Sequence, residues 1–141
     1  MEERRNRLRR PARAVAVLAG ALLPPLPASA TGCELGPGTR LESKNFLAAY
    51  RTLPAAIPQG RHFMLEFSIC PRAGIAAPSP AALRLDAHMP EHRHGMNYRP
   101  SVKAAGPGRF TSEGWLFHMP GRWEFVFDVA GERLTHSVRV E

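Results

Sequence analysis

Apolar and polar residues alternate along much of this chain, which is the pattern of β-strands with one buried face. The alternation is clearest in residues 63–69, 83–89 and 123–129, and a further strand is expected over residues 134–140. Helical periodicity is nearly absent, so the chain should fold almost entirely as strands. Weaker strand patterns occupy residues 45–51, 101–104, 109–112 and 115–118.

Segments rich in proline and glycine separate these strands and should form turns. They are residues 54–60, 71–80, 95, 106–108, 120–121 and 130–131. About seven or eight short strands with such regular turn signals predict an all-β fold, an antiparallel β-sandwich. Six large side chains should face inward, because a register slip of one residue would expose them all. They are Phe63, Leu65, Phe67, Trp123, Phe125 and Phe127.

Residues 1–30 have the features of a secretory signal peptide that is removed on export. Six arginines within residues 4–13 precede an apolar run over residues 14–26, and residues 28–30, Ala-Ser-Ala, form a small-residue cleavage site. The apolar run is shorter than the ~20 residues that span a bilayer, so it is not a clear membrane anchor. We expect residues 31–141 to form one mature domain that is periplasmic or secreted.

Removing the signal peptide changes the charge of the protein. The whole chain carries a net charge of +7, of which six arginines and two glutamates in residues 1–30 contribute +4. The remaining 13 basic and 10 acidic residues leave +3. No basic stripe with interleaved aromatic residues remains, so a nucleic-acid partner is not supported.

The chain contains two cysteines, Cys33 and Cys70. An isolated pair in an exported protein usually forms a disulfide, which here would fasten the mature N-terminus to a predicted strand. Residues 30–33, Ala-Thr-Gly-Cys, also loosely resemble a lipidation signal, although Ala30 stands where leucine is usual. Lipidation of Cys33 would leave Cys70 unpaired, so the disulfide is favoured and a lipid anchor is the alternative.

Histidine and methionine are concentrated between residues 87 and 100. Imidazole nitrogen suits copper and zinc, and thioether sulfur selects Cu(I). Packing alone gives little reason to place so many titratable rings in one segment. The histidines and methionines of this segment are His88, His92, His94, Met89 and Met96.

The spacing of His92, His94 and Met96 predicts that they converge on one copper ion. Residues two apart lie on the same side of an extended backbone. A loop or bulged turn is expected here, with Gly95 free to take a positive φ. His88, on the preceding strand, is a candidate for a further nitrogen ligand.

A second His-Met pair, His118 and Met119, ends another predicted strand. If that strand and the one ending at Met89 reach the same end of the sandwich, the two His-Met pairs approach each other and His118 joins the site. Alternatively, both methionines cap the core and His88 and His118 face solvent. Two histidines lie away from the cluster and are expected to be structural, His62 and His136.

Other chemistries fit the sequence poorly. A blue-copper site needs a cysteine thiolate with two histidines, but Cys70 has no histidine nearby and is expected to be oxidised. There is no His-Glu-x-x-His, no Gly-x-Ser-x-Gly and no phosphate-binding glycine loop. Because no nucleophile–base pair is evident, the protein is not expected to be an enzyme.

Residues 89–96, Met-Pro-Glu-His-Arg-His-Gly-Met, and residues 119–123, Met-Pro-Gly-Arg-Trp, resemble the YtkA-like domain and the related FixH-like proteins. The similarity covers roughly residues 60–141. It implies an immunoglobulin-like β-sandwich and an association with copper handling, sometimes beside copper chaperones for the respiratory oxidase. FixH-like proteins are often membrane-anchored, and this chain departs from them in having no clear anchor. The positions that match are His92, His94, Met96, His118 and Met119.

Two functions of different classes follow from these observations. The first is an exported copper-binding protein that delivers copper or maintains its homeostasis through a His/Met loop, with an envelope protein as copper acceptor. A mixed site of imidazoles and thioethers can serve both Cu(I) and Cu(II). The alternative is a metal-free, immunoglobulin-like accessory or interaction module of the bacterial envelope, in which the loop is a recognition surface.

Overall fold

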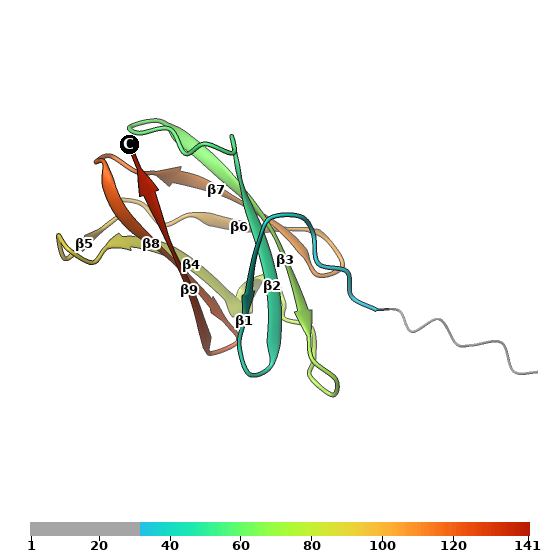
Figure 1. Ribbon diagram of the computed structural model, residues 1–141. Helices are drawn as coiled ribbons and strands as arrows, with labels where there is room; N and C mark the ends of the chain where they lie inside the picture. The colour runs from blue at the N-terminus through green and yellow to red at the C-terminus, as the bar shows by residue number, and fades with distance from the viewer. Residues whose placement is uncertain (1–31) are drawn as a thin grey trace, which may run out of the picture. The chain divides into compact units, whose positions relative to one another are not determined.

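The computed structural model describes residues 32–141, so the predicted signal peptide lies outside the described residues. The described chain is nearly all β, with nine strands in two antiparallel sheets (Figure 1). A single turn of 3-10 helix, Pro80–Ala82, precedes β4. No helix within this part of the chain has the length and apolar character needed to cross a membrane. The strands are β1 (Thr39–Glu42), β2 (Phe46–Leu53), β3 (His62–Pro71), β4 (Leu83–Met89), β5 (His94–Gly95), β6 (Ser101–Gly106), β7 (Arg109–Leu116), β8 (Gly121–Val129) and β9 (Glu132–Val140).

The order of the strands identifies the type of sandwich. One sheet has the order β1-β2-β3-β7-β6 and the other has the order β5-β4-β8-β9. If β2 is taken as strand A of an immunoglobulin domain, the two sheets read ABED and C′CFG, with β1 added at an edge. The predicted antiparallel, immunoglobulin-like sandwich is therefore confirmed, with nine strands rather than seven or eight.

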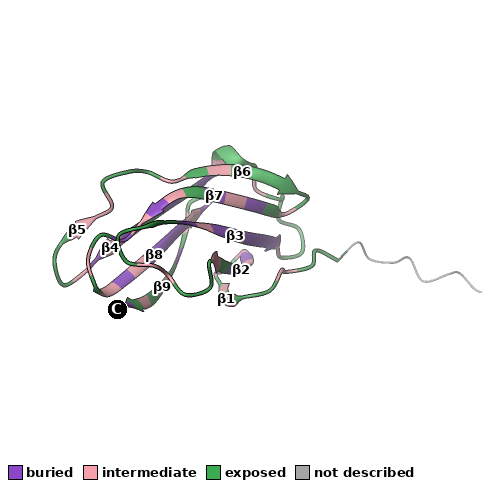
Figure 2. Ribbon diagram, turned by 90° about the horizontal axis from the view of Figure 1, so that it is seen from above, coloured by how far each residue is buried: buried purple, intermediate pink, exposed green. Residues whose placement is uncertain are grey.

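The core between the sheets is mainly aromatic. All six side chains predicted to face inward are at least 95% buried, and Figure 2 shows that buried positions lie along the strands of both sheets. Phe117 and Trp123 stack with ring centroids 4.2 Å apart and planes 5° apart. The indole N–H of Trp115 donates to the Ser112 hydroxyl at 2.9 Å, which satisfies both buried polar groups.

Three strand predictions were incomplete. The separate strands expected at 109–112 and 115–118 form the single strand β7, because a bulge opposite residues 63–65 accommodates Gly114 at φ 92° without ending the pairing. β1 was not predicted, since it has four residues and none of them is buried. β5 was not predicted because it has only two residues.

Cys33 and Cys70 form the predicted disulfide, with Cα atoms 5.4 Å apart. The bond joins the segment before β1 to the end of β3 and closes a loop with a sequence separation of 37. Loop entropy gives such a bond about 4 kcal/mol of stabilisation. A disulfide of this kind is typical of proteins from oxidising compartments, and a sulfur bonded to Cys70 is not available for a lipid.

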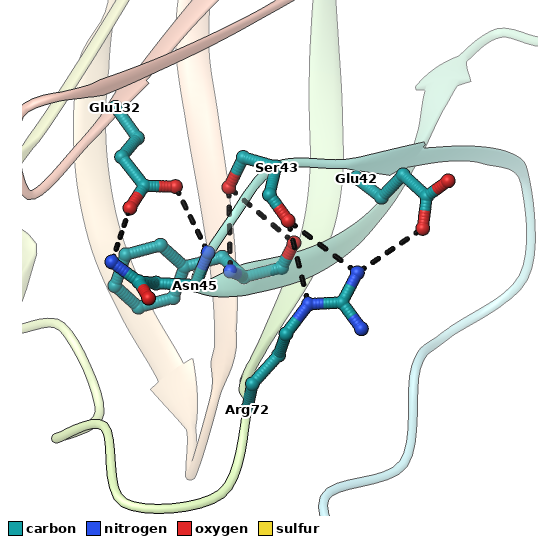
Figure 3. Close-up of polar contacts among 6 residues, drawn as sticks. Glu42, Ser43, Asn45, Arg72 and Glu132 are labelled. Carbon is teal, nitrogen blue, oxygen red and sulfur yellow. Dashed lines mark hydrogen bonds and ion pairs between the residues drawn. The ribbon is translucent and has the colours of Figure 1, made fainter.

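Polar side chains fasten the two sheets together at the end where β1 meets β2 (Figure 3). The carboxylate of Glu132, at the start of β9, accepts hydrogen bonds from the backbone and side-chain amides of Asn45. Hydrogen bonds from the Ser43 side chain and the Asn45 backbone hold the pKa of Glu132 below its usual range. Arg72 pairs with Glu42 at 3.1 Å and lies 3.4 Å from the Ser43 carbonyl. This end of the molecule is a structural brace.

Candidate metal site

The predicted ligands lie at the other end of the sandwich, where β4 turns into β5. Met89 pairs with His94 across this hairpin, and the turn between them is closed by a hydrogen bond from the His92 amide to the Met89 carbonyl at 3.1 Å. Arg93 takes the left-handed conformation, with φ 54°. The expectation that Gly95 would do so is wrong, because Gly95 is paired in β5 and is not among the residues with positive φ.

The hairpin turns the His94 side chain toward the inside of the sandwich. Residues directly opposite each other in an antiparallel pair project to the same face, and Met89 is fully buried on the inner face. His94 is half-buried, with its ring centroid 6.1 Å from that of Trp123 on β8. The inner edge of the hairpin therefore presents an imidazole beside the indole of Trp123.

His118 reaches the same place from the connection between β7 and β8, which crosses from one sheet to the other. Its ring centroid lies 5.2 Å from that of His94 and 5.5 Å from that of Trp123. The His92 ring lies 5.8 Å from the His94 ring. The rings of His92 and His118 are thus both neighbours of the His94 ring. The chain from His92 to Met96 is a turn and a short strand, not the continuous extended loop that was expected.

The two candidate thioether ligands, Met96 and Met119, are half-buried and pack against the edge of the core. The Met96 amide donates to the Ala87 carbonyl at 3.2 Å, and the indole N–H of Trp123 donates to the Met119 carbonyl at 3.0 Å. The first hydrogen bond fixes the backbone of Met96 against β4, and the second fixes the backbone of Met119 beside the Trp123 indole. Packing against the core accounts for part of the role of Met119, as the alternative interpretation proposed for Met89 and Met119. His118 is exposed, which that interpretation also expected.

His88 does not join this cluster. It is next to Met89 on β4 and therefore projects to the opposite, outer face of the sheet. There its Nε2 lies 3.5 Å from the Glu124 carboxylate. His88 therefore lies on the opposite face of the sheet from an ion held near His94.

His62 and His136 also lie apart from the three rings. His62 is exposed at the start of β3. The Nδ1 of His136 lies 2.6 Å from the hydroxyl oxygen of the buried Tyr50. Burial raises the pKa of Tyr50 to about 12, against a smaller lowering by a hydrogen bond with Thr39. Tyr50 therefore keeps its proton, and its hydrogen bond with the His136 ring gives His136 a structural role.

Two residues that support the cluster were not singled out from the sequence as part of a site. Trp123 was predicted only as a core residue, yet its ring lies beside both His94 and His118. Arg122 forms an ion pair with Glu91 at 3.1 Å and so fastens the hairpin turn to β8. Their position directly after Met119-Pro120-Gly121 was the available sequence signal.

The ring spacing is of the size that a shared ion requires. Two imidazoles bound to one ion have centroids roughly 5–6 Å apart, because each metal–nitrogen bond is about 2 Å long. The two separations, 5.2 and 5.8 Å, lie in this range. Within residues 32–141, however, no three His, Cys, Asp or Glu side chains are arranged to hold a metal as they stand. Metal binding would therefore involve rotation of rings, recruitment of thioether sulfur, or both.

Comparison with protein families, curated proteins and solved structures found no match for this chain.

Proposed function

We propose that this protein is an exported copper-binding domain that holds one copper ion between the β4–β5 hairpin and the β7–β8 connection. The observation that carries the proposal is the gathering of the His92, His94 and His118 rings, with centroid separations of 5.2 and 5.8 Å. His92 and His94 belong to one connection and His118 to the other, so the three rings come together only in the folded chain. Apart from packing on Trp123 and a 3.4 Å contact between the His94 Nδ1 and the Gly95 carbonyl, these three rings have no hydrogen bond or ion pair among the described residues.

The donor set supports copper in both oxidation states. Imidazoles suit Cu(II), and the thioethers of Met96 and Met119 favour Cu(I). Met119 directly follows His118, Met96 is two residues after His94, and both methionines are half-buried. A site of this composition can accept copper in one oxidation state and release it in the other, which suits delivery to an acceptor protein of the envelope.

Export is the second part of the proposal. The basic and apolar pattern of residues 1–30 is that of a secretory signal. The Cys33–Cys70 disulfide agrees with an oxidising compartment such as the periplasm. A copper carrier in this compartment needs no cysteine thiolate, which would be prone to oxidation there, and the proposed ligands contain none.

The test is a titration of the metal-free protein with Cu(I) and with Cu(II) against a competing chelator. Loss of a residue that only hydrogen-bonds to a metal ligand typically costs about 10–100-fold in metal affinity, so the change His92→Ala with His94→Ala should lower copper affinity by more than about 100-fold. His62→Ala is the matched control, since it removes an exposed imidazole near the same end of the sandwich. Acid should release the ion, because imidazole binds metal only in its neutral form. Equal affinity of the double variant and the wild type would contradict the proposal.

One observation favours the alternative of a metal-free interaction module. The planes of His94 and His118 stand at 70° and 80° to the plane of Trp123, so both rings can serve as packing around the indole. In that case the wild-type protein binds neither Cu(I) nor Cu(II) in the titration. Replacement of His94 and His118 then lowers stability without any effect on metal content.

A further inference from the structure

The net charge of residues 32–141 is concentrated at one end of the sandwich. Of the 13 basic and 10 acidic residues, four arginines and one glutamate lie in residues 54–61, 90–100 and 117–122, which leaves nine of each sign elsewhere. These three segments, here called the histidine end, therefore carry a net charge of +3. Arg139 and Glu141 lie at the same end, because Val140 pairs with Gly121, and they add one charge of each sign. The charged residues of the histidine end are Arg61, Arg93, Arg99, Arg122 and Glu91.

Two contacts connect the three segments. The Gly60 amide donates to the Phe117 carbonyl at 2.8 Å, which joins the first segment to the third. The His94 and His118 rings lie 5.2 Å apart, which joins the second to the third. Glu91 neutralises Arg122, with which it pairs. The other three arginines are exposed and have no acidic partner among the described residues.

Tyr98 stands out in the second of these segments. Its side chain is 65% exposed, and only one other large apolar residue of the described chain, Ile75, is exposed. Tyr98 directly precedes Arg99 and lies between two prolines of the 90–100 segment. An isolated tyrosine among arginines offers too little apolar area for the core of a stable protein interface. Tyrosine and arginine do, however, favour the interface between a membrane and water.

We propose that the histidine end docks on an anionic phospholipid surface, with the guanidinium groups of Arg61, Arg93 and Arg99 facing lipid phosphates and Tyr98 at the level of the headgroups. The binding is electrostatic and reversible, because it depends on three exposed guanidinium groups and one exposed tyrosine. Docking would turn the candidate metal site toward the membrane. The inference does not depend on copper binding, because it rests on charge and exposure alone.

The experiment measures co-sedimentation of the metal-free exported protein, residues 31–141 without the basic signal segment, with vesicles of phosphatidylcholine, with or without phosphatidylglycerol, at low salt. Each arginine near an anionic surface contributes about a fivefold change in partitioning. The change Arg61→Ser with Arg99→Ser should therefore weaken binding to the anionic vesicles about 25-fold. Tyr98→Ser should also weaken it, and added salt should abolish it.

The matched control is Arg40→Ser with Lys44→Ser, which removes the same charge from exposed residues on β1 and the turn after it. This control pair should bind like the wild type. The inference is overturned if the wild type binds both kinds of vesicle equally or neither, or if the control pair loses as much binding as the Arg61/Arg99 pair. Binding to polyglutamate but not to anionic vesicles would overturn it in favour of an acidic protein partner. Neither result would bear on the copper titration.

Discussion

The buried hydroxyl of Tyr50 should make the stability of the domain fall in alkali. Its pKa is about 12 in the folded protein, chiefly because burial disfavours the phenolate. In the unfolded chain the value is about 10. Below pH ~10 both states hold the proton and stability does not depend on this group. Between pH ~10 and ~12 the unfolded state releases the proton first, so the free energy of unfolding falls as the pH rises.

The size of this effect follows from the difference between the two pKa values. Two units correspond to about 2.7 kcal/mol, lost progressively as the pH rises through the folded pKa. Replacement of Tyr50 by Phe removes the ionisable group together with its 2.6 Å hydrogen bond to His136. The variant should be about 1 kcal/mol less stable near neutral pH, because that hydrogen bond is lost. It should lack the alkaline fall due to this group.

Urea unfolding followed by tryptophan fluorescence at a series of pH values measures this difference. The stability advantage of the wild type should shrink and then reverse as the pH rises. Tyr98→Phe is the matched control, since Tyr98 is 65% exposed, and its curve should follow that of the wild type. Curves of constant separation for wild type and Tyr50→Phe across the whole range would refute the reasoning.

Two further substitutions test the fold. Replacing Cys33 and Cys70 by serine should lower the free energy of unfolding by about 4 kcal/mol, and the intact mass of the wild type without reductant should be two hydrogens below the dithiol value. Gly121→Ala should destabilise by about 1–3 kcal/mol, because the new Cβ would lie 2.9 Å from Met89 Cε at φ 124°. Gly131→Ala isolates backbone strain, since Gly131 has φ 88° and no atom within 4 Å of the Cβ position. A cost for Gly121→Ala no larger than that for Gly131→Ala would contradict the packing argument.

The alternation of side chains was sufficient to predict the sandwich and its core. Strands such as β3 and β8 bury mainly one face, so apolar and polar residue types alternate along them. This alternation determines which residues point inward. β1 escaped prediction because none of its residues is buried. The division of β7 into two strands failed because Gly114 looks like a break in the sequence, while the bulge that tolerates it depends on the partner strand.

The candidate site was predictable in its residue types but not in its geometry. The sequence placed ligand chemistry at His92, His94 and His118, but the proximity of His94 and His118 depends on how two connections from different parts of the chain meet. The left-handed conformation of Arg93 has no local signal, since glycine would be the expected residue there. The position of His88 on the outer face follows from its place next to the buried Met89 on β4. The alternation over residues 83–89 allowed this, and the alternative in which His88 faces solvent describes it.

The most direct test of the copper proposal is the copper affinity of His118→Ala. His92 and His94 belong to one short segment and would bind some copper in an unfolded peptide, whereas His118 contributes only if the fold brings the two connections together. The account predicts that competition titration of His118→Ala with Cu(I) and Cu(II) shows a large loss of affinity, while His62→Ala retains the wild-type value. Wild-type affinity in His118→Ala would contradict a site built between the two connections.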